Sequence, residues 1–397
     1  MAELWTIEAN GAADVAETYG YMTDIIAGHD ETEQRISLRA RPVESIEYSI
    51  LCTSARESQL AESLIYAVQG DQVFVPYWQY GSRLTSAVAQ DDALLPITDA
   101  LDVPYRVNGN GLLWKDPFTV ELFSVSGVSA SGVTVGPIAN DWPAQTLIFP
   151  ARVMRITSRA AVEHESAAFL SGRLAFSGDV SVSEVLPSQT ETLSLYRTLP
   201  VLEVAPDRGG GARDDFDRRV LLLDPTPGIR TAFAPSAAPR TVRSFQWLSF
   251  SRADAKALRS FIDLRRGRAR PFWMLAWQED FTLASDHGGG AGALTVVARD
   301  YAVRIFNLGE GRRHVAVRAP GGSFHYRRIT AAVDNLNGTE TLTLDATVPD
   351  ALPAAGTFVT FLRLCRLETD EPRIEWVGGQ YASATLPFRE LPNEVAA

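Results

Sequence analysis

Histidine and cysteine are the residues of this sequence that could bind a metal ion or move protons. The chain has five histidines and two cysteines, which are His29, His164, His287, His314, His325, Cys52 and Cys365. No two histidines have the i, i+4 spacing of a zinc site, and the cysteines lie far apart. His164 lies between two glutamates and could join a metal site with distant carboxylates, although a solvated charged loop is the simpler interpretation.

Other arrangements that could support catalysis are equally incomplete. Asp286 and His287 could belong to a nucleophile relay, but no serine stands in a G-x-S-x-G turn, so the pair predicts a turn. Glycoside cleavage needs two carboxylates a few ångströms apart. Candidate pairs of adjacent acids, such as 91–92, 214–215 and 279–280, lie in turn-like stretches, and adjacency in sequence does not direct two carboxylates at one bond. We therefore predict that the chain is not an enzyme, and we assign no catalytic, cofactor-binding or metal-binding residue.

Aromatic residues suggest a different function, because sugar sites stack rings on aromatic platforms. Trp78 with Tyr77 and Tyr80, or Trp273 with Trp277, could form such a platform. These rings follow an apolar helix, however, and packing against that helix explains them. A carbohydrate- or receptor-binding module is the alternative function.

The elements that would position these residues occur twice. Segments 54–70 and 251–267 each begin with serine and end with glycine. The serine can cap the first helical turn together with the acid three places later, Glu57 or Asp254. Glycine supplies a left-handed stop. Apolar residues form one stripe in each helix, at Leu60, Leu64, Ile65 and Val68, and at Leu258, Phe261 and Ile262.

Matches before and after these helices extend the repeat. A strand pattern precedes each helix, at 46–50 and 245–247, and an aromatic strand reaches Trp78 or Trp277 after it. Further downstream, segment 143–155 matches 353–366, and 174–176 matches 386–388. Other strands are predicted at 119–125, 146–156, 294–297, 302–306, 314–318, 341–344 and 358–367.

The sequence thus predicts a mainly β, α+β fold of two tandem units. Residues 1–190 form the first unit and 191–397 the second, and each is an antiparallel β-sandwich or barrel-like unit with one packed α-helix. The boundary lies between 186 and 213, where prolines and a run of glycines at 209–211 collect. That run lacks the lysine and hydroxyl of a phosphate-binding loop and predicts an exposed loop.

Some predicted strands place arginines beside apolar residues, as at 324–329 and 363–366, which gives a charged sheet face. A solvated face is the simplest interpretation of any one strand. Many such strands would leave long sheet edges that must be covered or paired, and assembly into a ring would do so.

Composition narrows the class of protein further. The chain has 397 residues, of which 46% are apolar and 21% charged, as in ordinary globular proteins. A net charge of -11 argues against a surface that binds nucleic acid. No signal peptide is visible at 1–10, and no run of 18 apolar residues predicts membrane insertion. We expect synthesis and folding in a cytoplasm.

Several segments resemble structural proteins of tailed bacteriophages. Segment 32–42 resembles the opening of tailed-phage virion proteins. Segment 243–272 resembles distal-tail proteins of long-tailed phages and gene-transfer agents, and 335–345 with 353–357 is of a kind often met in phage tail proteins. This family carries no catalytic residues to transfer, and the present chain differs from its single-copy pattern by containing two units.

The resemblance implies a baseplate or tail-tip ring that joins the tail tube protein to the tip hub and host-recognition complex. Such a protein would be assembled in the host cytoplasm and located in the virion tail. Because tubes of this kind are sixfold and hubs are commonly threefold, three two-unit chains would make a pseudo-sixfold ring. An ordinary hexamer is the other possibility. The net charge further predicts an acidic lumen through which DNA passes without specific binding.

Overall fold

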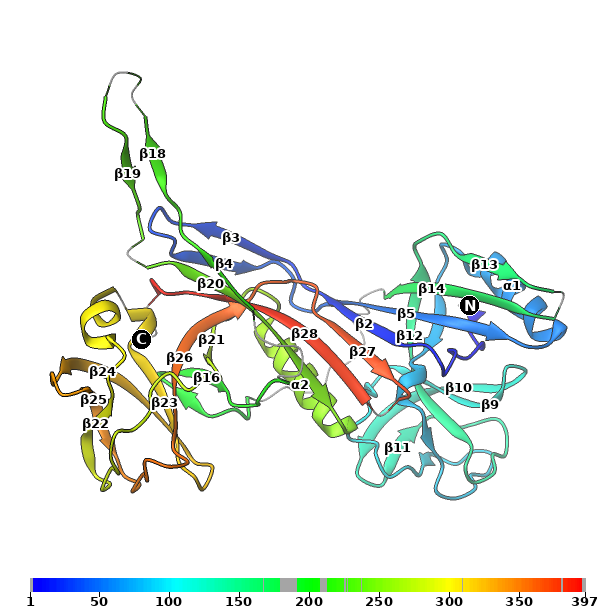
Figure 1. Ribbon diagram of the computed structural model, residues 1–397. Helices are drawn as coiled ribbons and strands as arrows, with labels where there is room; N and C mark the ends of the chain where they lie inside the picture. The colour runs from blue at the N-terminus through cyan, green and yellow to red at the C-terminus, as the bar shows by residue number, and fades with distance from the viewer. Residues whose placement is uncertain are drawn as a thin grey trace.

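The computed structural model describes residues 3–394, apart from 167, 179–190, 208–212, 225, 227, 237, 309 and 380. These residues form a mainly β, α+β structure of antiparallel sheets with two 14-residue α-helices, as predicted. Two lobes lie side by side and are joined by long strands (Figure 1). We call the described residues up to 178 the first half and those from 191 onward the second half. Within the predicted boundary region 186–213, residues 191–207 and 213 are described, whereas the glycine run at 209–211 lies outside the described residues.

The first half contains, in order, β1 (Glu3–Leu4), β2 (Val15–Gly20), β3 (Thr23–Ala27), β4 (Glu33–Ser37), β5 (Val43–Cys52), α1 (Ala55–Val68), β6 (Val73–Pro76), a 3-10 turn (Trp78–Tyr80), β7 (Ser82–Arg83), β8 (Leu94–Leu95), β9 (Asn110–Asp116), β10 (Thr119–Ser129), β11 (Gly132–Val135), β12 (Leu147–Ile156), β13 (Ala161–His164) and β14 (Leu170–Gly178).

The second half contains β15 (Leu195–Tyr196), β16 (Leu199–Leu202), β17 (Arg213–Asp217), β18 (Leu221–Leu223), β19 (Thr231–Phe233), β20 (Arg240–Ser249), α2 (Arg252–Arg265), β21 (Phe272–Leu275) and β22 (Ala291–Val297). A π-helical turn (Tyr301–Ile305) and two 3-10 turns (Phe306–Leu308 and Glu310–Arg312) follow. The half ends with β23 (His314–Arg318), β24 (Phe324–Asp334), β25 (Thr339–Val348), β26 (Phe358–Leu367), β27 (Arg373–Val377) and β28 (Tyr381–Glu390).

The two halves share one pattern of strand pairing. In the first half, β6 pairs in parallel with β1 and antiparallel with β12, and β14 pairs with β12, β13 and β5. In the second half, β21 pairs in parallel with β16 and antiparallel with β26, and β28 pairs with β26, β27 and β20. The meander β8-β11-β10-β9-β12 is matched by β22-β25-β24-β23-β26. Each pairing of the first half named here therefore has a counterpart in the second.

The registers of these pairings also agree, residue by residue. Ser251 lies 197 positions after Ser54. Ala16 lies opposite Glu47, and the residues 197 positions later, Arg213 and Ser244, also lie opposite each other. The hairpins β3–β4 and β18–β19 have the same interval and register. Even the bulges in β10 and β24 fall at matching places. Corresponding residues can therefore be compared directly between the halves.

One antiparallel sheet connects the halves. Its strand order is β13-β14-β5-β2-β27-β28-β20-β17, and the junction between the halves is the pair β2 and β27. A cluster of buried apolar residues also includes both halves, from Trp5 to Leu391. A second cluster, from Ala276 to Phe361, fills the meander of the second half.

Both predicted helices form with the predicted serine caps, whereas the left-handed residue that ends α2 is Arg266, directly before Gly267. The hydroxyl of Ser54 accepts a hydrogen bond from the Glu57 amide, and that of Ser251 accepts one from the Asp254 amide. Gly70 and Gly267 follow the helices with φ of +88° and +63°, in the left-handed region that favours glycine.

Two local predictions are wrong. Segment 302–306 is a helical turn rather than a strand, because Asp300 starts it in a left-handed conformation and its carbonyl accepts the Arg304 amide. The charged face expected for 363–366 is not solvated, since Arg363 and Arg366 are both buried. Their guanidinium groups bind Thr241 and Glu33 instead.

Candidate assembly interface

The junction between the halves is first a main-chain interaction. Strand β2 lies antiparallel to β27, with Ala16 opposite Glu375 and Glu17 opposite Ile374. The ladder continues past the strand end, where the Tyr19 amide donates to the Pro372 carbonyl at 3.1 Å. Backbone pairing of this kind joins two edges largely independently of side-chain chemistry.

The hairpin β3–β4 extends from the first half over the second (Figure 1). Arg366 donates to both oxygens of Glu33 at 2.6 and 2.9 Å, and Arg35 donates to both oxygens of Glu394 at 2.7 Å. Such paired bonds between a guanidinium and a carboxylate are strong and directional. These ion pairs fix the hairpin to the second half, and we call the hairpin β3–β4, residues 23–37, the clamp.

A buried charge cluster around Glu44 also joins the two halves. Glu44 of β5 accepts a hydrogen bond from Arg259 of α2 at 3.2 Å, and it also contacts Arg106 and Arg152. The Tyr77 hydroxyl donates to the same carboxylate at 3.0 Å. Burial raises the pKa of Glu44, but the three guanidinium groups outweigh it and hold the pKa at about 2. The carboxylate is charged at neutral pH and binds the halves together.

The beginning of α2 makes further contacts across the junction. Arg252 donates to the Ser82 hydroxyl at 3.1 Å and pairs with Asp99, both in the first half. Lys256 donates to the Leu101 carbonyl at 2.7 Å. Helix α2 thus contacts the first half near both of its ends, since the Tyr21 hydroxyl bonds to Asp263 close to the C-terminal end.

The histidines considered from the sequence are scattered and have separate partners. His164 pairs with Glu62 at 2.9 Å, and His325 pairs with Asp350 at 2.8 Å. His314 is buried, with its Nδ1 2.9 Å from the Tyr196 hydroxyl. The buried His287 lies beside the Val348 carbonyl, and the ring of His29 stacks on Phe233. In the described ranges, no three histidine, cysteine or acidic residues are grouped so that they could hold a metal ion.

The cysteines and adjacent acids have structural surroundings. Cys52 and Cys365 are buried free thiols, and burial raises their pKa to about 11 and about 12. Asp214 pairs with Arg243, and Asp280 accepts the Phe361 amide at 2.7 Å. Asp286 accepts the Ala354 amide at 2.7 Å. These carboxylates stabilise the loops and strands in which they lie.

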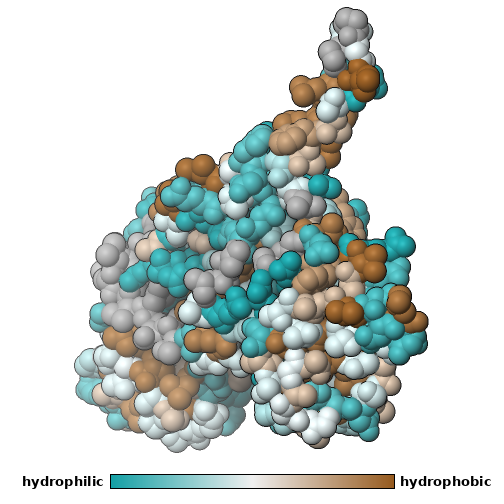
Figure 2. Space-filling model, turned by 90° about the vertical axis from the view of Figure 1, so that its left-hand side faces the viewer, coloured by the Kyte–Doolittle hydropathy of each residue, from teal (hydrophilic) through white to brown (hydrophobic). Residues whose placement is uncertain are grey.

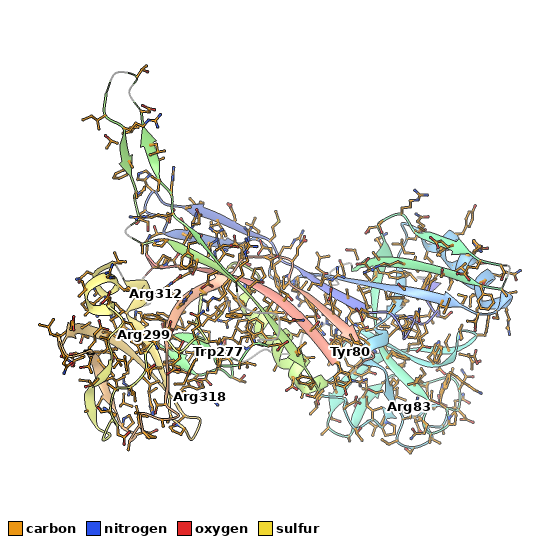
Figure 3. All side chains as sticks on the ribbon, in the orientation of Figure 1. Tyr80, Arg83, Trp277, Arg299, Arg312 and Arg318 are labelled. Carbon is orange, nitrogen blue, oxygen red and sulfur yellow. The ribbon has the colours of Figure 1, made fainter. Side chains whose placement is uncertain are left out.

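The candidate platform aromatics belong to the core. Tyr77, Trp78, Tyr80, Trp273 and Trp277 are all buried. Figure 3 shows Tyr80 close to the junction of the lobes and Trp277 within the second half. Tyr80 packs edge-on against Trp376 of β27 at a centroid distance of 4.8 Å, so it contributes to the junction.

Sequence reasoning found the repeat but missed the junction. Glu33, Glu44 and Arg259 received no role, because their partners lie hundreds of positions away in the chain. One signal was available: arginines alternate with apolar residues at 363–366, and buried guanidinium groups of that kind need distant carboxylates.

No known protein family matches this chain, and no curated protein sequence matches it. Within the described part of the chain, no helix is both long and apolar enough to cross a membrane.

Proposed function

We propose that this protein is a structural component of a bacteriophage tail, in which sister chains close into a ring. The observation that carries the proposal is the sheet that joins two matching halves through β2 and β27. The same kind of contact that joins the two halves within one chain can also join the second half of that chain to the first half of another chain. Contacts of this head-to-tail kind generate closed rings when their rotation closes.

The ring is proposed to lie at the distal end of the tail, between the tail tube protein and the tip hub. The supports for this location are the resemblance of segments 32–42 and 243–272 and the two-unit chain. Three such chains present six similar halves, which suits a sixfold tube on one side and a threefold hub on the other. DNA would pass through the lumen without specific binding, in keeping with the net charge of -11.

The alternative of a sugar- or receptor-binding module has less support. Its candidate rings are packed inside the protein, and a stacking platform requires exposed faces. No catalytic role is proposed.

The test is the mass and shape of the purified protein. Three chains of 43.3 kDa give about 130 kDa, to be measured by native mass spectrometry and seen as rings by negative-stain microscopy. A particle of six chains would replace the trimer by a hexamer. A monomer at micromolar concentration, both alone and with the tail tube protein of the same genome, would overturn the proposal.

A further inference from the structure

The chain ends its central sheet with two edge strands that correspond to the two strands of the junction. Strand β17 matches β2, since Arg213 lies 197 positions after Ala16. Strand β13 matches β27, since Glu163 and Glu375 lie opposite the equivalent residues Ser171 and Ser383. Among the described residues, β13 pairs only with β14 and β17 only with β20. Strand β17 thus corresponds to β2 but has no described strand in the place of β27, and β13 corresponds to β27 but has no described strand in the place of β2.

Burial differs between the two sets of strands in the way that a missing partner predicts. Tyr19 is 1% exposed at the junction, whereas the equivalent Phe216 is 67% exposed. Trp376 of β27 is 1% exposed, whereas the equivalent His164 is an exposed residue. Unpaired sheet edges of this kind are templates for pairing with another chain.

The hairpin next to β17 is exposed in the same way. Hairpin β18–β19 has the register of the clamp β3–β4, yet it projects away from both lobes (Figure 1). Its exposed apolar residues are Val220, Leu221, Leu222, Leu223, Ile229 and Phe233. Figure 2 shows these brown side chains on a projection that stands clear of the body. An apolar projection of this kind marks an interaction surface.

We propose that β17 of one chain pairs antiparallel with β13 of a second copy of this chain, in the register of β2 and β27. This inference rests on the proposed ring and specifies its contact. The register places Arg213 opposite Glu163 of the second copy, because Ala16 lies opposite Glu375. Opposite charges at facing positions stabilise an antiparallel pair. In the isolated chain, the largely exposed Arg213 pairs with Asp215 on its own strand.

The hairpin β18–β19 then lies on the first half of that second copy, as β3–β4 lies on the second half within one chain. Its landing site includes the end of α1. Tyr21 of the clamp region meets Asp263 near the end of α2, and the residue of α1 equivalent to Asp263 is Tyr66. Tyr66 is 93% exposed, which is unusual for a large aromatic side chain. At the same interval Arg218, which directly precedes the hairpin, takes the place of Tyr21, so this docking would put its guanidinium against the Tyr66 ring.

Engineered disulfides test the register. In the junction, the Tyr19 amide donates to the carbonyl of the facing Pro372. Because hydrogen-bonded pairs alternate along an antiparallel ladder, Ala16 and Glu375 form a pair without such bonds, whose side chains lie closest. The double variant Arg213→Cys with Glu163→Cys is therefore expected to cross-link neighbouring chains under oxidation. Non-reducing electrophoresis should show covalent dimers and trimers. Both substituted positions are on exposed edges, so the fold is expected to persist.

Two further pairs control this experiment. Ala16→Cys with Glu375→Cys should form the equivalent bond within one chain, without any increase in mass. Arg213→Cys with Ala161→Cys is two residues out of register and should cross-link poorly. Rings that form without cross-linking at 213 and 163 would overturn the β17–β13 contact while leaving the ring intact. Absence of any assembly in the unmodified protein would overturn the ring itself.

Charge exchange gives a second, independent readout. Arg213→Glu should weaken association about tenfold, because attraction to Glu163 becomes repulsion. The variant that combines Arg213→Glu with Glu163→Arg should regain most of the affinity, as measured by analytical ultracentrifugation. Failure of the double variant to recover affinity would contradict the register.

The hairpin is tested by two neighbouring leucines. Leu222 matches Ile25, which is partly buried on the clamp, whereas Leu221 matches the exposed Asp24 on the opposite face. Leu222→Asp should therefore weaken association by about tenfold or more, and Leu221→Asp should do so much less. Equal effects of the two variants would overturn the proposed docking of the hairpin.

Discussion

Glu33 and Arg366 form a bidentate ion pair across 333 positions of sequence, and both side chains are only 4% exposed. Burial raises the pKa of Glu33, but Arg366 and Arg35 lower it overall. Glu33→Gln would leave the Arg366 charge buried with less compensation. We expect unfolding to become easier by about 3 kcal/mol, measured by urea denaturation. Asp300→Asn removes an exposed ion pair with Arg304 and should change stability by under about 0.5 kcal/mol.

Acid should weaken the junction through Glu44. Its pKa in the folded protein is about 2, below the ordinary value of 4.5, so its contribution to stability is complete above pH 4.5. That contribution is lost as the pH falls from 4.5 toward 2. Glu44→Gln should therefore be less stable than the parent by about 3 kcal/mol at pH 7. The difference should shrink as the pH approaches 2, measured by denaturant unfolding at several pH values. A difference that does not depend on pH would contradict this role.

The two helix-ending glycines should respond differently to alanine. At Gly267 a Cβ would lie 2.9 Å from the Cβ of Tyr21 and would also meet Asp370, whereas nothing lies within 4 Å at Gly70. Gly70→Ala should cost about 1 to 2 kcal/mol from its positive φ alone, and Gly267→Ala should cost clearly more. Thermal unfolding of the two variants measures the difference. Equal losses would show that Tyr21 and Asp370 do not restrict Gly267.

Removal of either helix cap should have a modest effect. Ser54→Ala and Ser251→Ala each remove a hydroxyl that accepts a hydrogen bond from an amide of the first turn, at 3.2 and 3.1 Å. Each should lower stability by about 1 kcal/mol. Ser63→Ala is the control, because this exposed hydroxyl bonds only to the Gln59 carbonyl within α1. Ser63→Ala should be neutral or slightly stabilising.

Features that depend on nearby residues could be predicted from the sequence. Ser54 and Ser251, with an acid three places later and a glycine at the end, define helices whose physics is local. Most of the predicted strands form, and the matches at 143–155 and 353–366 recur as the equivalent strands β12 and β26. The predicted strand at 302–306 does not form, because a short apolar segment of five residues suits a single helical turn as well as a strand.

Features that depend on distant residues could not be predicted. Nothing in the sequence near Glu33 or Glu44 shows that Arg366 and Arg259 will face them. The sequence also does not show that β2 leaves the first half to pair with β27. The repeat could be inferred by comparing the sequences of the two halves. The junction could not, because it depends on how the two folded halves lie relative to each other.

The clamp β3–β4 is rich in charge, whereas its counterpart β18–β19 is mostly apolar at equivalent positions. The clamp and the surface that it contacts belong to one chain, so their effective concentration is high and this contact forms even in a very dilute solution. The second must form by collision, and its apolar surface supplies the driving force. Gene fusion would in this way divide assembly into a permanent step and a concentration-controlled one, which would delay oligomerisation until enough chains had accumulated.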